Sequence, residues 1–300
     1  MEKGFVMNVE EIQGHLKMTD GFNLFYRCWK ASPEIKRVIV AIHGGGDHSG
    51  WFKVMGPKLA ADGNQVYALD LRCFGNSVEE GLPRGDTRDF KRHLQDIDDT
   101  IGYVRRTHPS KKLYMLGFSL GGCYTLWYAA NHPDSLDGLV LAAPAIVVRA
   151  MSTRIVSIEL FFANLFAPRM MYDLMNSSFE KGRDPEDIKI ILEDPLGTTK
   201  FSIRYSANSK KLLMDKALEN ASHIQKPTLI LQGEVDDAAL PHGAKLLYES
   251  LGTKDKSLQT FPDASHWFYD AFLPAMPRAK YDPSKREHLF SIMKDWLRTH

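Results

Sequence analysis

The stretch KKLYMLGFSLGGCYTLWYAA, from Lys111 to Ala130, begins like a buried β-strand and ends like a helix. Gly117 and Gly121 stand two positions before and two positions after Ser119, where the strand should turn into the helix. This G-x-S-x-G spacing is typical of a nucleophile elbow, a tight turn that exposes a serine Oγ above a sheet. A plain glycine turn with a capping serine is the alternative, and the rest of the chain has to decide between the two.

Short apolar runs alternate with longer amphipathic segments on both sides of this stretch. Strands are predicted from apolar or β-branched runs at residues 37–46, 64–72, 112–118, 136–145, 227–233 and 257–263. Helices are predicted from apolar residues at steps of three and four, over residues 87–107, 120–131 and the C-terminal segment. This alternation predicts an α/β fold with a mostly parallel central sheet flanked by helices.

The alternation stops between residues 147 and 221. Apolar residues of this segment recur at helical spacing without a strand-like run, as in Ile155, Ile158, Phe162 and Leu165. We therefore predict a core formed by residues 1–146 and 222–300, and a helical cap insertion formed by residues 147–221. A cap would cover the carboxyl edge of the sheet, where open α/β sheets bind ligands. Ordinary packing inside a small subdomain is the alternative reading of its apolar residues.

A serine hydroxyl is a weak nucleophile at neutral pH, so it needs a base and a group that orients that base. In a sheet of this kind both follow the serine in the chain, on loops after later strands. Among the histidines after Ser119, His266 is the one that follows a predicted strand in this way. Three acids follow the strand at 227–233, and we favour Asp236 while Asp237 and Glu234 stay open.

Acyl transfer also needs two N–H donors for the oxyanion that develops on the substrate. One is expected to be the backbone N–H of Leu120, the residue after the nucleophile. The other is expected in the glycine-rich loop after the strand at 37–46, where we favour Gly45 and keep Gly44 as the alternative. Such a loop could instead bind phosphate, but no GxGxxG or GK[ST] pattern follows it.

The composition favours a globular chain with a large core. Of its 300 residues 44% are hydrophobic, and 38 Lys and Arg balance 37 Asp and Glu without long runs of one sign, which argues against nucleic-acid binding. Cys28, Cys73 and Cys123 form neither a CxxC pair nor a disulfide framework, so we expect a reduced, cytoplasmic protein without a zinc site. We also expect neither a signal peptide nor a transmembrane helix, because the N-terminal segment is acidic and no 18-residue apolar run occurs.

Five motifs occur in the order and places that a known enzyme group shows. They are HGGGDHSGWF (43–52), LDLRCFGNS (69–77), GFSLGG (117–122), GEVD (233–236) and DASHWF (263–268). Together they resemble the α/β-hydrolase superfamily, and within it the monoacylglycerol lipase and lysophospholipase group. The resemblance covers about residues 21–297, apart from most of the insertion.

The resemblance implies a triad of Ser119, Asp236 and His266, oxyanion donors at Gly45 and Leu120, and a cap that shapes an acyl pocket. The G-x-x-D spacing of the group's acid motif matches Asp236 rather than its neighbours. Two departures from the pattern occur. Cys73 stands where the pattern has a glycine, and Asp237-Ala-Ala follows Asp236 where branched aliphatic residues are usual.

We therefore predict a serine hydrolase of carboxylic esters, with monoacylglycerol or a similar medium- or long-chain acyl ester as its small-molecule substrate. His266 takes the Ser119 proton, Asp236 orients the imidazole, and water hydrolyses the acyl-enzyme, so this chemistry requires no metal or organic cofactor. A general carboxylesterase or a serine aminopeptidase of the same superfamily is one alternative. A receptor-like binding module with the hydrolase fold and little turnover is another.

Five further residues are candidates for contact with the substrate: Gly44, His48, Phe161, Phe162 and Trp267. A histidine at position 48 could equally brace the oxyanion loop through backbone hydrogen bonds. The apolar group of the insertion could pack inside the cap, line the pocket or touch a membrane or lipid surface, and it consists of Phe161, Phe162, Phe166, Met170 and Met171. Cys123 is expected to be a small buried residue rather than a reactive thiol.

Overall fold

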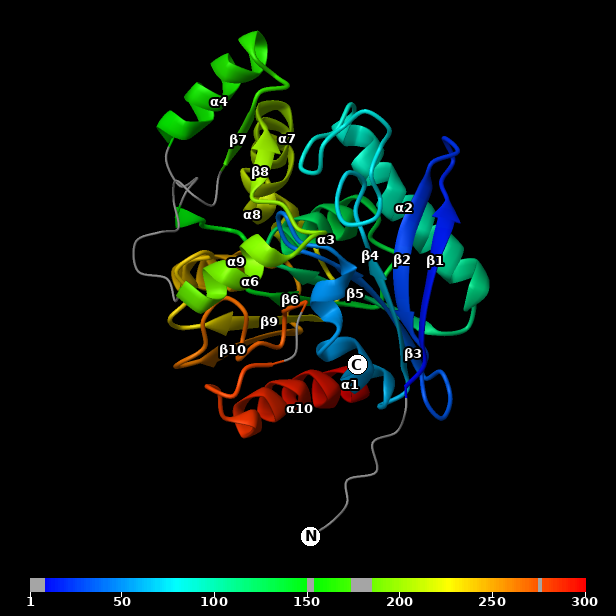
Figure 1. The fold of residues 1–300 in the computed structure, drawn as a ribbon. Coiled ribbons are helices and arrows are strands. Elements are labelled where there is room, and N and C mark those ends of the chain that lie inside the picture. The colour runs from blue at the N-terminus through cyan, green and yellow to red at the C-terminus, as the bar shows by residue number, and fades with distance from the viewer. Residues whose placement is uncertain (1–8, 150–153, 174–184, 275–276) are drawn as a thin grey trace.

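The computed structural model describes residues 9–149, 154–173, 185–274 and 277–300, and an eight-stranded sheet lies at its centre (Figure 1). The strand order is β1-β2-β4-β3-β5-β6-β9-β10. The pairs β1–β2 and β2–β4 are antiparallel and the other neighbours are parallel, which confirms the predicted mostly parallel sheet. The strands are β1 (Glu11–Lys17), β2 (Asn23–Trp29), β3 (Arg37–Ile42), β4 (Asn64–Leu69), β5 (Lys112–Phe118), β6 (Gly138–Ala142), β9 (Thr228–Gly233) and β10 (Lys256–Phe261).

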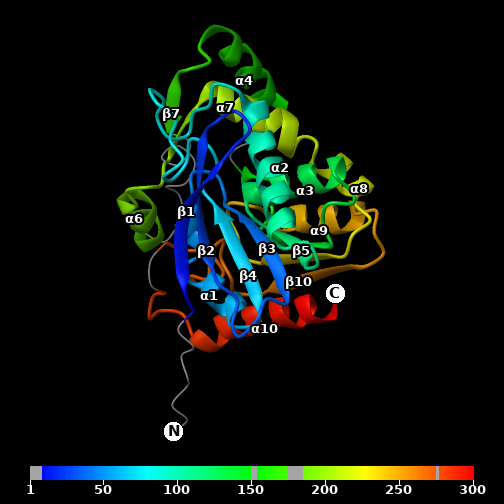
Figure 2. The same ribbon diagram turned by 90° about the vertical axis from the view of Figure 1, so that its right-hand side faces the viewer.

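Helices cover both faces of this sheet, as Figures 1 and 2 show. One face carries the short helix η1 (Ser49–Phe52), α1 (Met55–Ala60) and α10 (Pro283–Thr299). The other carries α2 (Phe90–Thr107), α3 (Leu120–Asn131), α8 (Ala217–His223) and α9 (Pro241–Ser250). Two apolar clusters result, one on each side, because parallel strands bury both of their faces.

Helix α2 shows how the sequence pattern produces an element. The Asp89 side chain accepts a hydrogen bond from Lys91 N at 2.9 Å and thereby caps the helix. The apolar residues that the periodicity singled out are all buried, namely Phe90, Leu94, Ile97, Ile101 and Val104. The opposite face is charged, so the helix has one side for the core and one for solvent.

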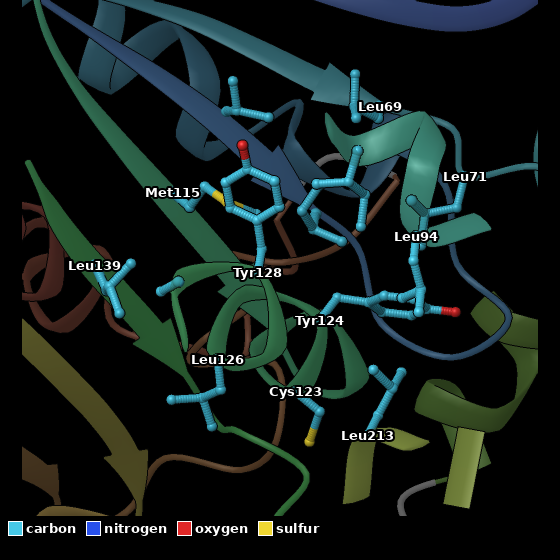
Figure 3. Packing of buried hydrophobic residues seen from close by; sticks show 14 of the residues in the cluster. Leu69, Leu71, Leu94, Met115, Cys123, Tyr124, Leu126, Tyr128, Leu139 and Leu213 are labelled. Atoms are coloured by element: carbon cyan, nitrogen blue, oxygen red, sulfur yellow. The ribbon is translucent and has the colours of Figure 1, made fainter. Parts of the chain in front are cut away.

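Helix α3 is apolar around most of its circumference and is packed on several sides. Figure 3 shows Cys123, Tyr124, Leu126 and Tyr128 of α3 inside a cluster that includes Leu213. The Cys123 thiol is fully buried and burial raises its pKa to about 12, so it is a packing group rather than a nucleophile. This helix therefore gives Ser119, at its N-terminus, a rigid support.

The segment at 147–221 contains two short strands as well as helices. Its described elements are α4 (Arg154–Phe166), β7 (Met171–Asp173), α6 (Pro185–Glu193), β8 (Lys200–Ser202), α7 (Ile203–Ser209), the π-helical turn η3 (Lys210–Met214) and most of α8. The predicted boundary at 221/222 thus falls inside α8, which packs on the core. β7 and β8 pair antiparallel, so the insertion contains a short two-stranded sheet besides the helices that were predicted for it. Strands of three residues are too short to leave a periodic pattern in the sequence.

None of the helices within the described ranges combines the length and the apolar character that crossing a bilayer requires.

Candidate active site

Ser119 occupies a strained turn between β5 and α3. Its backbone has φ 53° and ψ −119°, a region that residues with a side chain rarely adopt. Two hydrogen bonds to the end of β6 hold it there: Ser119 N donates to Ala142 O at 2.9 Å, and Ala145 N donates to Ser119 O at 3.1 Å. The turn places the serine at the carboxyl end of the sheet, as the predicted nucleophile elbow requires.

The two glycines of the motif are steric necessities. A Cβ on Gly117 would lie 2.4 Å from Gly121 O, and a Cβ on Gly121 would lie 2.1 Å from Ile42 O. Both obstacles are backbone atoms, which cannot rotate away. The spacing around Ser119 is therefore a consequence of how closely β3, β5 and α3 pass one another.

His266 and Asp236 come from the loops after β10 and β9. His266 Nδ1 lies 2.7 Å from Asp236 Oδ2, and neither side chain is exposed by more than 8%. Asp236 Oδ1 accepts hydrogen bonds from Ala238 N and Ala239 N, each at 2.9 Å. The carboxylate is thus held in place and accepts a hydrogen bond from His266 Nδ1–H. This leaves Nε2 as the basic nitrogen.

The three acids considered from the sequence therefore occupy different positions. Asp236 contacts His266, Asp237 is half-buried and Glu234 is exposed.

Ser119 and His266 line one cavity together with Gly45 and Leu120, the two expected oxyanion donors. Parts of its wall come from the insertion, which contributes Val148, Phe201, Tyr205, Ser206, Ser209 and Met214. Most of the remaining wall is apolar and includes Trp51 and Trp267. A mainly apolar cavity with a few converging polar groups is the usual form of a small-molecule site.

The loop after β3 brings its glycines against the elbow. A Cβ on Gly45 would lie 3.7 Å from Leu120 Cδ2, so the two expected donors are neighbours, and a Cβ on Gly44 would lie 3.1 Å from Ser119 Cβ. His43 fixes this loop, because its Nδ1 donates to Gly44 O at 2.7 Å and its Nε2 accepts from Leu71 N at 3.0 Å. Burial lowers the pKa of His43 to about 4, which keeps the ring neutral in this tautomer.

His48, a candidate for substrate contact, lies behind this loop. Its Nδ1 accepts from Gly50 N at 3.1 Å and its Nε2 donates to Asp194 Oδ2 at 3.0 Å. Trp51 Nε1 donates to the same Asp194 oxygen at 2.9 Å. The bracing role considered for His48 therefore fits its position, and its partner Asp194 comes from the insertion, directly after α6.

The aromatic candidates fall into two groups. Trp267 is 4% exposed and stands on the cavity wall beside His266. Phe161 and Phe162 are 65% and 54% exposed and are not among the residues that line the cavity, which corrects the expectation that they contact substrate there. The reason is the direction of α4, whose aromatic face turns to the surface.

Asp47 is a site residue that the motifs did not single out. It lines the cavity and is 6% exposed. Burial and the nearby charge of Asp194 raise its pKa well above the ordinary value of 3.8. An uncharged carboxyl group can donate as well as accept a hydrogen bond. The feature of the sequence that could have identified Asp47 as a site residue is its position directly after the glycines of the HGGGD stretch.

Within the described residues, no group of three or more histidine, cysteine or acidic side chains is arranged to hold a metal ion.

The chain matches the family of serine aminopeptidases S33 over residues 33–269. Monoglyceride lipase of Mus musculus is 28% identical over 256 residues, which cover 84% of this chain and 82% of the lipase. Monoacylglycerol lipase of Mycolicibacterium smegmatis is 26% identical over 250 residues, which cover 82% and 86%. The crystal structure of Paleococcus ferrophilus monoacylglycerol lipase has 26% identity and a TM-score of 0.75, covering 92% of this chain and 99% of that one. These similarities confirm the predicted α/β-hydrolase fold.

Proposed function

Since the chain belongs to the serine aminopeptidase S33 family of hydrolases, we propose that it cleaves monoacylglycerols and similar esters with medium or long acyl chains. That it is a carboxylic ester hydrolase follows from its relatives and from the family. The choice of substrate is supported by the names of those relatives and by the mainly apolar wall of the cavity beside Ser119. A long acyl chain would exchange water for apolar side chains on binding there.

The observation that carries the proposal is the meeting of an elbow serine and an aspartate-bound histidine at one cavity. In the proposed reaction His266 Nε2 takes the Ser119 proton while Oγ attacks the ester carbonyl carbon. The backbone N–H groups of Gly45 and Leu120 stabilise the oxyanion. The protonated His266 returns its proton to the departing alcohol, and a water activated by the same nitrogen then releases the fatty acid and regenerates Ser119.

The test is hydrolysis of p-nitrophenyl esters with two to sixteen carbons, and of a monoacylglycerol, by the wild type and Ser119→Ala. We expect activity on medium or long chains in the wild type and a loss of roughly 10³-fold or more in the variant. Ser291→Ala, at an exposed serine of α10, is the matched control and should keep wild-type activity. Equal inactivity of wild type and Ser119→Ala across the whole panel would count against the proposal.

The family's name favours one alternative substrate class, namely aminoacyl amides. An aminoacyl p-nitroanilide measured beside the esters distinguishes the two, because an aminopeptidase should prefer the amide with a free amino group. A receptor-like role would instead give stoichiometric labelling of Ser119 by a fluorophosphonate without turnover of any ester. Preference for the long-chain esters is the result that we expect.

We also propose that α4 brings the enzyme to lipid surfaces, where such substrates reside. Five apolar side chains of α4 and one that follows it are between 54% and 80% exposed, namely Ile158, Phe161, Phe162, Leu165, Phe166 and Met170, whereas Leu160 of the same helix is buried. Figure 1 shows α4 at the end of the molecule opposite α10. A contiguous exposed apolar patch on one helix is typical of a surface that inserts into a membrane interface.

Co-sedimentation with phosphatidylcholine vesicles tests this proposal. We expect the double variant Phe162→Asp/Phe166→Asp to bind at least about tenfold more weakly, because each change removes apolar area and adds a charge that resists burial. Leu246→Asp, at an exposed leucine of α9, should bind as the wild type does. Equal sedimentation of all three proteins would show that α4 is not the contact surface.

We further propose a reducing, cytoplasmic location. The support is that Cys28, Cys73 and Cys123 are all free and buried, so folding leaves three thiols unpaired. Secreted proteins rarely keep several free cysteines. Fractionation of the source cells, with detection by antibody, tests the location directly.

A further inference from the structure

The loop that carries His266 continues into a left-handed turn. Phe268, Tyr269 and Asp270 have φ values of 47°, 58° and 65°, and none of them is glycine. Left-handed backbone is disfavoured for residues with a Cβ, and three in succession are rare. Such a conformation persists only where the surrounding structure holds it in place. Contacts with the surrounding residues therefore hold this turn, which begins two residues after His266.

Aromatic packing holds the apolar side of the turn. Phe268 is fully buried. The centroid of its ring lies 5.7 Å from that of Phe261 and 5.8 Å from that of Phe272. Phe272 in turn stacks on Phe118 at 4.4 Å, and the ring of Phe118 lies 5.0 Å from that of His266. The turn and the imidazole thus share one packed surface. A shift of the turn would be transmitted to the histidine ring.

Arg278 holds the polar side. Its backbone N, Nε and Nη2 donate to the Asp270 carboxylate at 2.8, 2.9 and 2.5 Å. The Asp270 side chain has no exposure and that of Arg278 is only 11% exposed. A fork of donors on a buried carboxylate is one of the strongest and most directional contacts that a protein can make. It fixes the last residue of the left-handed turn.

The same guanidinium also reaches the insertion. Arg278 Nη1 lies 2.5 Å from Asp187 Oδ1 in α6, whose side chain is 7% exposed, and Lys280 Nζ approaches that oxygen to 3.5 Å. Arg278 therefore joins the turn behind His266 to the first turn of α6. The other end of α6 leads to Asp194, which holds the oxyanion loop through His48.

We propose that Arg278 is a positioning residue for His266: by holding Asp270 it fixes the left-handed turn that sets the imidazole, and by binding Asp187 it makes that hold depend on α6. This inference rests on the proposed function, in which His266 is the base. Arg278 does not touch the reacting atoms, so its effect should be on the geometry of the hydrogen bond between His266 and Asp236 and on the rate of the chemical step. It should leave substrate binding largely unchanged.

The experiment compares Arg278→Gln, Arg278→Lys and Asp187→Asn with the wild-type protein. Two quantities are measured: kcat and KM for a medium-chain p-nitrophenyl ester, and the low-field proton resonance of the hydrogen bond between His266 Nδ1 and Asp236. For Arg278→Gln we expect kcat to fall about 10- to 100-fold with KM within about threefold, and the resonance to shift or vanish. Arg278→Lys should recover part of kcat, and Asp187→Asn should lose less because Asp270 keeps its donors.

Arg204→Gln is the matched control. Arg204 also binds a buried aspartate through two donors, Asp86 at 2.6 Å each, and also ties the insertion to the core, but it does not contact the histidine loop. It should therefore keep the wild-type resonance. A general loss of cap attachment would instead affect Arg204→Gln and Arg278→Gln alike.

A folded Arg278→Gln with wild-type kcat and an unchanged resonance would overturn the inference. If that variant does not fold, the other two decide, and wild-type values for both Arg278→Lys and Asp187→Asn would overturn it as well. Because the resonance does not depend on turnover, a wild-type protein without esterase activity would refute the proposed function and would still leave this inference measurable.

Discussion

At the scale of single residues, Gly121 shows how little room the elbow leaves. A Cβ added to Gly121 would lie 2.1 Å from Ile42 O. We predict that Gly121→Ala lowers the free energy of unfolding by about 2 to 4 kcal/mol, because the backbone of β3 or α3 has to move. Urea unfolding followed by circular dichroism measures this change.

Gly102→Ala provides the comparison within the same chain. Gly102 lies inside α2, and an added Cβ would meet only the end of the flexible Arg106 side chain, at 3.3 Å. We expect this substitution to stabilise the protein by about 0.5 to 1 kcal/mol, as alanine does in a helix interior. Destabilisation of similar size by both substitutions would mean that the close approach at the elbow is not what matters.

The acids after β9 allow a second prediction at this scale. Asp236 holds His266 at 2.7 Å, whereas Asp237 is half-buried beside it in sequence. We predict that Asp236→Asn lowers kcat on an ester by about 10⁴-fold, because an amide favours the wrong imidazole tautomer. Asp237→Asn should change kcat little. The reverse order of effects would reassign the acid to Asp237.

The sequence was informative about these residues because each follows a recognisable strand or glycine motif. Ser119 and His266 could be named from their distance to a strand end. Asp236 was favoured on that ground, but only the G-x-x-D spacing of the resembling group selected it from Asp237 and Glu234. Asp270 and Arg278 could not, since a left-handed turn without glycine leaves no trace in composition, and their pairing depends on how a loop folds back. Contacts that join distant loops are outside what periodicity and spacing can predict.

At the scale of elements, α6 connects two loops of the active site. Its C-terminal end leads to Asp194, which receives hydrogen bonds from His48 and Trp51. Burial by itself raises the pKa of this carboxyl group, but the hydrogen bond and electrostatic attraction of the His48 ring and the Trp51 N–H outweigh burial and bring the pKa down to about 2. Because this value lies below the ordinary 3.8, the ionised form stabilises the fold fully above about pH 4, and that contribution is lost as the pH falls through about 2.

We therefore predict that Asp194→Asn destabilises the protein by about 1 to 2 kcal/mol at pH 7. The difference from the wild type should shrink as the pH is lowered from 5 to 2.5, since protonation removes the same charge from the wild type. Urea unfolding of both proteins across this range measures it. A difference that stays constant would show that Asp194 acts through shape rather than charge.

Four described strands were not predicted from the sequence, and composition or length explains three of them. The fourth, β2, is mostly buried and apolar, and nothing in the structure explains why its pattern was missed. The edge strand β1 is exposed at alternate positions and contains few apolar residues, so it resembles a loop in composition. β7 and β8 have three residues each. The buried parallel strands, in contrast, were all predicted, because burial on both faces leaves an unmistakable apolar run.

At the scale of the whole molecule, two buried histidines couple folding to pH. Burial lowers the pKa of His43 to about 4 and that of His93 to about 3, from an ordinary value of 6.5. Both rings are neutral in the native state and take up protons on unfolding. Their stabilising contribution is therefore complete above about pH 6.5 and is lost as the pH falls toward their folded values.

We predict that, near pH 5, these two histidines lower the free energy of unfolding by about 2.5 kcal/mol for each unit by which the pH falls. Urea unfolding at pH 7, 6, 5 and 4.5 measures the slope. His93→Gln should reduce it by about half of that amount, whereas His15→Gln, at an exposed position of β1, should leave it as in the wild type. A slope that is unaffected by His93→Gln would show that other groups govern acid unfolding.

Three of the side-chain contacts between the insertion and the core also matter for protein engineering. They join Asp187 to Arg278, Asp194 to His48 and Arg204 to Asp86. A chimaera that takes residues 147–221 from another hydrolase would replace Asp187, Asp194 and Arg204 at once. Arg278, His48 and Asp86 of the core would then lose these partners. The insertion is therefore not an interchangeable module, and a graft intended to change the substrate range has to keep acids and an arginine at the places of Asp187, Asp194 and Arg204.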